Sequence, residues 1–491
     1  MSKNIRVSSE VGTLKRMIIH SPDAGIGKIA PRMMEDLLYD DIVYLDKMRE
    51  EYNQYLRVLL WFLDPDVMRN RDKSNADFFK PSKAGYLKSD KVLDAENLLM
   101  QVLQNDLAKQ LLVSAVCAME KCDFETQMLL MKMDAETLTR TLISGVWLYE
   151  GEEDYLFAPI PNFIFTRDIG IVINDHLLLI KAAEKGRTRE ALLIKYIAYF
   201  VLFGDEAKWD EYSFSDKVIE LEDNEYYFLT DSLQKEQQEV SIEGGDVMMI
   251  SPRHLLVGLS ARTTQNAIHQ LTTQLFQRNL VDKVSVVNIP AERAYMHIDT
   301  IFTMIKRDSW VVYAPFTKDA ITLSKEEVDF RRMLDDEMET PEEQVYVTQF
   351  LREEKPDGEF KVKVKEFDFL DDLLADVSKG DFGCEKVNII PNGGAKFPFT
   401  EREQWTDSCN FLAIREGVII GYDRNTYTNK TLQERGFKLI RAEDFNNQME
   451  AGAKLEDLIT GDTLISLPSS ELSRARGGTH CMSLPLLREE I

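Results

Sequence analysis

The chain has 491 residues, the length of two or three ordinary domains or of one large domain with an insertion. Apolar residues make up 44% of it and charged residues 29%, close to a globular average, which argues against extensive disorder. The net charge of −25 argues against nucleic acid or an anionic membrane as the main partner, although it does not disfavour a cationic small molecule.

The N-terminus and the cysteines bear on location. The first residues have no apolar core of a signal peptide, and no run reaches the ~18 apolar residues of a membrane-spanning helix. The cysteines are odd in number and irregularly spaced, which indicates no disulfide framework; they are Cys117, Cys122, Cys384, Cys409 and Cys481. We therefore expect a reduced, cytoplasmic protein that makes no membrane contact.

The first third of the chain predicts one strand followed by helices. Lys15–His20 has the pattern of a short strand. From about Pro31, apolar residues recur at helical spacing, and breakers are few between Asp36 and Ile143. We expect a mostly helical insertion over residues 31–154.

After Pro159 the pattern changes to short β-type runs, with helices such as Thr264–Gln277 between some of them. The runs are Ile169–Ile173, Leu177–Ile180, Val247–Ile250, Leu255–Val257, Trp310–Tyr313, Val387–Ile390, Phe411–Ile414, Val418–Tyr422 and Leu464–Leu467. Strands that alternate with helices indicate an α/β fold. Residues 1–30 and 155–491 would form this α/β body.

Two segments, 205–238 and 324–360, interrupt the alternation and look inserted. The second is rich in acidic residues and has few strand signals. We expect it to be a solvated helical excursion rather than a site.

Five short segments combine glycine, acids, histidine or arginine with flanking strands. They are PNFIFTRD (Pro161–Asp168), EGGDV (Glu243–Val247), SARTT (Ser260–Thr264), MHIDT (Met296–Thr300) and RARGGTHCM (Arg474–Met482). On an extended strand His297 and Asp299 would point into one cleft, as an acid/base beside a carboxylate. The alternative is a core histidine with an aspartate that caps a turn.

The glycine pairs suggest two further functional side chains. In EGGDV the two glycines permit a tight strand entry that aims Glu243 inward, although an ordinary turn with solvated acids is the alternative. Cys481 follows another Gly-Gly turn, near Arg474, Arg476 and His480, and a cationic surrounding would make its thiolate a nucleophile. The alternative there is a buried structural cysteine.

These residue types point to one kind of chemistry. No CxxC, HxxxH or HExxH spacing supports a metal site, and no P-loop or GxGxxG motif supports nucleotide binding. A cysteine, a histidine and several carboxylates, without metal or cofactor, suit attack on a guanidinium carbon. A guanidinium stays protonated, so paired carboxylates must hold it while the thiolate attacks.

In this order the five segments resemble the arginine deiminase family of guanidino-modifying enzymes. The resemblance extends to SEVGTLKRMIIHSP (Ser9–Pro22), LLYDDIVYLD (Leu37–Asp46), EREQWTDSCNFLAI (Glu401–Ile414), GYDRNTYTNKTL (Gly421–Leu432) and SSELSRARGGTHCMSLPL (Ser469–Leu486). It departs from the family pattern at Ala261, where an acid is usual, and at Met33, where an asparagine is usual.

The resemblance implies a role for each matching residue. Cys481 would be the nucleophile and His297 the general acid/base, while Asp168, Glu243 and Asp299 would grip the guanidinium. The remaining matches would line the cleft (Asn162, Phe165), bind the substrate carboxylate (Arg187, Arg262) or gate the site beside the nucleophile (Arg476).

The resemblance also implies a fold and an activity. The fold would be a five-bladed α/β propeller of repeated ββαβ modules with an inserted helical domain. The activity would be hydrolysis of L-arginine to L-citrulline and ammonia through a covalent amidino-thioether, with no metal or cofactor and in a homo-oligomer. The alternatives are another guanidino substrate, transfer of the amidino group to an amine, or an arginine-binding protein without catalysis.

Overall fold

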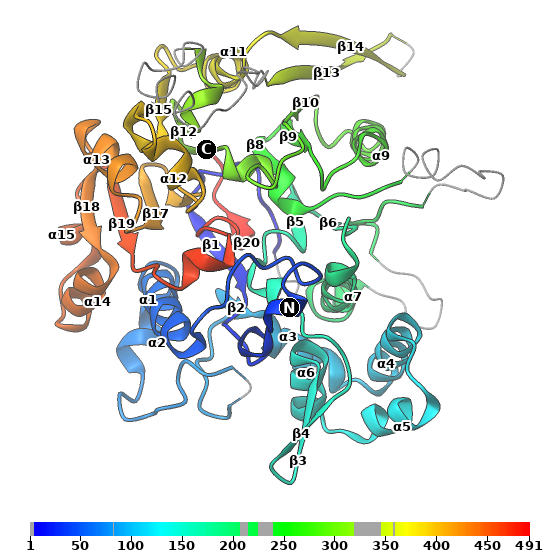
Figure 1. The fold of residues 1–491 in the computed structure, drawn as a ribbon. Helices are drawn as coiled ribbons and strands as arrows, with labels where there is room; N and C mark the ends of the chain where they lie inside the picture. The colour runs from blue at the N-terminus through cyan, green and yellow to red at the C-terminus, as the bar shows by residue number, and fades with distance from the viewer. Residues whose placement is uncertain (1–3, 82, 207–214, 224–238, 319–344, 357–358) are drawn as a thin grey trace, which may run out of the picture.

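The computed structural model describes the chain except for residues 1–3, 82, 207–214, 224–238, 319–344 and 357–358. Strands and helices alternate over most of it, as expected for an α/β fold (Figure 1). Among the described helices, none is both long enough and apolar enough to cross a membrane.

The described strands form five sheets of three or more strands and one separate hairpin. Each of the five contains an antiparallel pair in which one strand also pairs with a parallel third strand. Four of these trios are β5 (Gly170–Ile173), β6 (His176–Leu179) and β7 (Val218–Ile219); β8 (Val247–Ser251), β9 (His254–Leu259) and β10 (Lys283–Asn288); β11 (Phe302–Lys306), β12 (Ser309–Val312) and β15 (Asn388–Pro391); and β16 (Leu412–Arg415), β17 (Val418–Tyr422) and β19 (Thr463–Leu467). β18 (Lys438–Arg441) adds a parallel strand to the last sheet.

The fifth sheet joins the two ends of the chain. β20 (Leu484–Arg488) pairs antiparallel with β1 (Leu14–Ile19), which pairs in parallel with β2 (Val92–Asp94). In Figure 1 the sheets follow one another around the body, with β1 and β20 between the first and the last of the other four. The loop that carries Cys481 leads directly into β20, so it lies close to N-terminal segments.

Helices connect the strands within each sheet. They include α7 (Thr188–Ile197), α9 (Gln265–Gln277), α11 (Leu370–Asp376), α13 (Thr426–Glu434) and α14 (Ala442–Glu450). All nine β-type runs after Pro159 coincide with strands, and the helix expected at Thr264–Gln277 is α9, for which the Thr264 side chain accepts the N-terminal hydrogen bond. The predicted α/β class is therefore confirmed.

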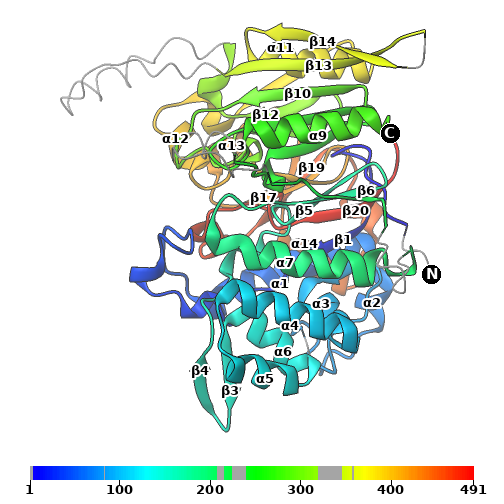
Figure 2. The same ribbon diagram turned by 90° about the vertical axis from the view of Figure 1, so that its right-hand side faces the viewer.

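The segment 31–154 is mostly helical, as expected. It contains α1 (Leu45–Leu63), α2 (Pro65–Asn70), α3 (Ala95–Leu103), α4 (Asp106–Glu120), α5 (Phe124–Lys132) and α6 (Ala135–Ser144). Carboxylate or amide oxygens of Asp94, Asn105, Asp123 and Asp134 cap the last four. Figure 2 shows α3 to α6 at one end of the molecule, beside the hairpin of β3 (Val146–Tyr149) and β4 (Glu152–Tyr155). The segment is not purely helical, because β2 lies within it.

The expectation of a helical excursion at 324–360 is wrong for its described C-terminal part. β13 (Tyr346–Glu354) pairs with β10, and β14 (Phe360–Phe367) pairs with β13, so both extend a sheet. The charges of β14 alternate with apolar residues, which is the period of a strand with a solvated face. Residues 324–344 lie outside the described part. In 205–238, the short strand β7 likewise belongs to a sheet.

Candidate active site

One pocket brings together every predicted site residue except Asp299. Its predicted members are Asn162, Phe165, Asp168, Arg187, Glu243, Arg262, His297, Arg476 and Cys481. Leu38, Met296, Thr300 and Ala475 also line it, and the sequence did not single out these four. Residues more than 300 positions apart in the chain thus share one buried pocket.

Short turns in front of successive first strands hold the reactive side chains. Asp168 precedes β5, Glu243 precedes β8, His297 precedes β11 and Cys481 precedes β20. Gly245 allows the close approach, because a Cβ there would lie 2.6 Å from His297 Nδ1 and 2.9 Å from Asp168 Oδ1. The Gly-Gly pair of EGGDV therefore makes room for the histidine.

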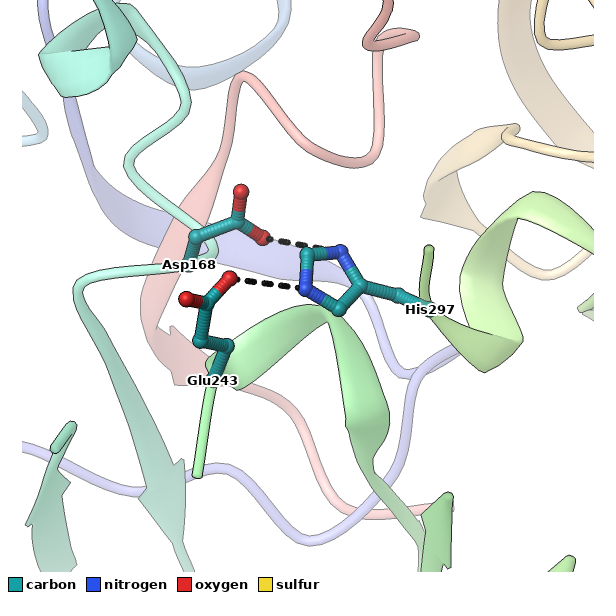
Figure 3. A group of neighbouring side chains, drawn as sticks. All are labelled: Asp168, Glu243 and His297. Carbon is teal, nitrogen blue, oxygen red and sulfur yellow. Dashed lines mark hydrogen bonds and ion pairs between the residues drawn. The ribbon is translucent and has the colours of Figure 1, made fainter. Parts of the chain in front are cut away.

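His297 lies between two carboxylates (Figure 3). Its Nε2 is 2.9 Å from Glu243 Oε2, and its Nδ1 is 3.8 Å from Asp168 Oδ1. Burial lowers the pKa of His297, but Asp168, Glu243 and Asp246 outweigh burial and raise this pKa to about 10. Burial would raise the pKa of Glu243, but Arg187 and His297 lower it to about 2. His297 is thus a cation hydrogen-bonded to an anion at neutral pH.

The predicted extended strand through His297 and Asp299 is wrong. Ile298–Thr300 forms a 3-10 turn, and the side chain of Asp299 contacts the loop that carries Cys481. Asp299 Oδ2 accepts hydrogen bonds from His480 Nδ1 at 2.9 Å and from the Cys481 thiol at 3.3 Å. Burial raises the pKa of Asp299, but these contacts and nearby His297 lower it overall.

Cys481 is buried and neutral in this arrangement. Burial and the carboxylates Asp299, Asp168 and Asp407 hold the pKa of its thiol well above the ordinary value. Asn410 Nδ2 donates to Sγ at 3.1 Å, and Asn410 Oδ1 accepts the backbone N–H groups of His480 and Cys481, each at 3.0 Å. The sequence prediction missed Asn410, although it lies within the EREQWTDSCNFLAI block.

Arg187 lies among the acids. Its Nη1 is 2.9 Å from Asp168 Oδ2 and 3.2 Å from Glu243 Oε2, and its Nε is 3.0 Å from Glu190 Oε2. All four side chains are at most 6% exposed. Glu190, which the sequence prediction also missed, follows Arg187 by three residues and faces it from the first turn of α7.

The remaining predicted residues lie at the pocket margin. Arg262 pairs with Glu184 at 3.3 Å, and Asn162 Nδ2 donates to the Leu37 carbonyl at 2.7 Å. Phe165 packs so closely on Gly477 that a Cβ there would lie 2.3 Å from its ring.

Arg476 lies over the Trp405 ring, with its guanidinium carbon 3.4 Å from the ring centroid. It also lies 3.6 Å from Asp40, and its backbone has a φ of 60°. Asp40 belongs to the LLYDDIVYLD block, so that block contacts the RARGGTHCM segment that carries Cys481.

One group of three side chains could serve as metal ligands. Atoms of Asp168, Glu243 and His297 lie within 4.8 Å of one another. A ligating imidazole must be neutral, whereas the two carboxylates favour protonated His297. The guanidinium of Arg187 also hydrogen-bonds both carboxylates. The two carboxylates therefore already hold an organic cation, the guanidinium of Arg187.

Comparison with known proteins identifies the family of the chain. The family model described as "Arginine deiminase" matches residues 35–488. An arginine deiminase of Bacillus cereus (strain ATCC 10987 / NRS 248) is 28% identical, and one of Limosilactobacillus reuteri (strain DSM 20016) is 27% identical, each over 100% of both chains. A solved amidinotransferase from Microseira wollei is 11% identical, with a TM-score of 0.48, over 99% of this chain and 98% of that one. The family match spans most of the sequence, and the chain belongs to the arginine deiminase family.

Proposed function

We propose that the chain hydrolyses L-arginine to L-citrulline and ammonia through a covalent intermediate on Cys481. The observation that carries this proposal is a set of buried acceptor oxygens around the thiol. Asp168 Oδ1, Glu243 Oε1 and Asp299 Oδ1 are buried and have no hydrogen-bond partner among the described residues. Such acceptors match the N–H groups of a guanidinium, and leaving them unpaired is costly.

The arginines of the pocket suit an α-carboxylate. Arg187, Arg262 and Arg476 all line it. Buried nitrogens of Arg187 (Nη2) and Arg476 (Nε and Nη1) have no hydrogen-bond partner among the described residues. A ligand with a guanidinium at one end and a carboxylate at the other would satisfy both sets.

The substrate itself would activate the nucleophile. The thiol of Cys481 stays protonated because it is buried beside carboxylates. A guanidinium placed against it adds the cation that favours the thiolate, and the thiol proton passes to solvent. The thiolate then attacks the guanidinium carbon and a C–S bond forms. Protonated His297 gives its proton to the departing nitrogen, the C–N bond breaks, and ammonia leaves.

The same histidine would serve the second half of the reaction. After the first step His297 is neutral and can take a proton from a water molecule as that water adds to the thioether carbon. The C–S bond then breaks, the remaining O–H proton of the added water passes to the sulfur and restores the thiol, and citrulline leaves. Glu243, hydrogen-bonded to His297, keeps the imidazole oriented through both steps.

A citrulline assay with purified protein tests the proposal. Cys481→Ala should abolish turnover, and Cys384→Ala is the matched control because Cys384 does not line the pocket. No citrulline from the wild-type protein would refute the proposal. Comparing kcat/KM for arginine, agmatine and methylarginine would expose a different guanidino substrate, and a new guanidino product with added glycine or ornithine would reveal an amidinotransferase.

We extend the proposal to the organisation of the chain. The five sheets, each with an antiparallel pair and a parallel third strand, support a five-bladed propeller of ββαβ modules. We assign residues 1–30 and 155–491 to this catalytic body and 31–154 to a helical insertion, with β2 as its contribution to the body. We regard 205–238 and 324–360 as additions to the family pattern. A cytoplasmic homo-oligomer is part of the proposal, and light scattering after gel filtration tests the oligomer.

A further inference from the structure

The side chain of Arg187 holds two of the three carboxylates that the proposed function gives to the guanidinium of the substrate. Its Nη1 hydrogen-bonds Asp168 Oδ2 and Glu243 Oε2, from the two carboxylates that also flank His297. The side chain of Arg187 and the proposed substrate carry the same functional group, a guanidinium. The protein thus supplies, from its own chain, the same chemical group that it is proposed to bind.

The charge balance of this cluster makes joint occupancy unfavourable. Arg187 and protonated His297 offset Asp168 and Glu243, all of them buried. The other nearby acids are already paired, Glu190 with Arg187 and Asp299 with His480 and Cys481. A second guanidinium would therefore have to share carboxylates that already hold a cation, which is costly for a buried charge. A substrate guanidinium must therefore displace Arg187 from the two carboxylates.

Glu190 can hold the side chain of Arg187 after its displacement from the two carboxylates. Its Oε2 accepts a hydrogen bond from Arg187 Nε at 3.0 Å, and its side chain is fully buried. Nε lies nearer the backbone than the terminal nitrogens, so rotation of the guanidinium about this contact moves Nη1 and Nη2 and keeps the tether. Nη2 is already buried without a hydrogen-bond partner among the described residues.

We propose that Arg187 occupies the guanidinium subsite of the free protein and that Glu190 tethers it as it turns to the substrate carboxylate. This rests on the proposed function, because the subsite is the one assigned there to arginine. Apart from the tether to Glu190, the displaced Arg187 regains an anionic partner only from a ligand that carries a carboxylate. Because of this displacement, the pocket selects guanidines that carry an acidic group at the far end. Glu190 is a positioning residue and touches no substrate.

Calorimetric binding of L-arginine and n-butylguanidine separates this proposal from simple carboxylate recognition. Cys481→Ser serves as the parent so that no turnover occurs. Arg187→Met in this parent removes the internal competitor, so the Kd of butylguanidine should fall at least about tenfold while that of arginine rises.

Arg262→Met is the matched control. Arg262 lines the same pocket and carries the same charge, but it pairs with Glu184 and not with Asp168 or Glu243. Its loss should weaken arginine binding and change the Kd of butylguanidine by no more than about twofold. If Arg187→Met also leaves butylguanidine within that range, or weakens it together with arginine, the proposal is overturned.

Glu190→Gln tests the tether and remains informative if Arg187→Met does not fold. Without the charge of Glu190, a displaced Arg187 has no anion to meet unless the ligand brings one. Butylguanidine should therefore bind about fivefold more weakly, and arginine should change less. An equal change for both ligands would indicate a purely structural role and contradict the tether. These are binding measurements, so an absence of arginine turnover would overturn the proposed reaction without deciding the displacement.

Discussion

Replacing Gly245 by alanine perturbs the site without removing any reactive group. The added Cβ would lie 2.6 Å from His297 Nδ1 and 2.9 Å from Asp168 Oδ1. Ordinary contact begins at 3.4 Å, so the imidazole must retreat by 3.4 − 2.6 = 0.8 Å. Because a displacement of about 1 Å in a catalytic group costs about 10²-fold in rate, kcat/KM for arginine should fall about 100-fold.

A coupled assay of citrulline or ammonia release measures this effect. Gly461→Ala is the control, because a Cβ at Gly461 meets nothing within 4 Å. Thermal unfolding of both variants separates a misplaced histidine from a loss of fold. A folded Gly245→Ala protein with the kcat/KM of the wild type would refute the claim that Gly245 leaves the space that His297 needs.

Three further predictions follow from the same contacts. Asn410→Ala removes the acceptor for two buried N–H groups at Cys481, so chemical denaturation should show a loss of about 2–6 kcal/mol and activity should fall; unchanged stability would count against the Asn410 contacts. The pKa of His297 is raised in the folded protein from 6.5 to about 10, so its ionisation stabilises the fold fully below pH 6.5, and this contribution disappears as the pH rises through about 10. The difference in unfolding free energy between wild type and His297→Asn should shrink over that window, and a constant difference would be inconsistent with it. EDTA should leave kcat unchanged, whereas inhibition reversed by a divalent metal would assign Asp168, Glu243 and His297 to a metal site instead.

Much of the fold could be predicted from local patterns. The β-type runs after Pro159 are buried strands of four to six residues, and their apolar character is visible in sequence. β13 was misread as helical because it follows an acidic stretch and ends in charged residues, and its pairing with β10 depends on residues far away in the chain. β2 was missed within the helical segment because it has only three residues, and pairing with β1 holds it in place.

The site could be predicted where chemistry accompanies a motif. His297, Glu243 and Cys481 follow or flank glycine-rich or strand-entry segments, and the structure brings them to one pocket. Asn410 and Glu190 could not be found in this way, since nothing in their local sequence sets a buried contact apart from an exposed one. Their partners are Cys481, 71 positions away, and Arg187, whose position among the acids depends on strands far apart in the chain.

The central claim is that Cys481 carries the substrate during turnover, and rapid-quench mass spectrometry tests it most directly. Protein mixed with L-arginine, stopped in acid within the first turnovers and digested should yield a Cys481 peptide heavier by the mass of arginine less ammonia. The same peptide from His297→Asn should carry less adduct at the same time point, because this variant lacks the proton donor for the departing ammonia. An unmodified Cys481 peptide from protein that is actively producing citrulline, or an adduct on another residue, would contradict the account.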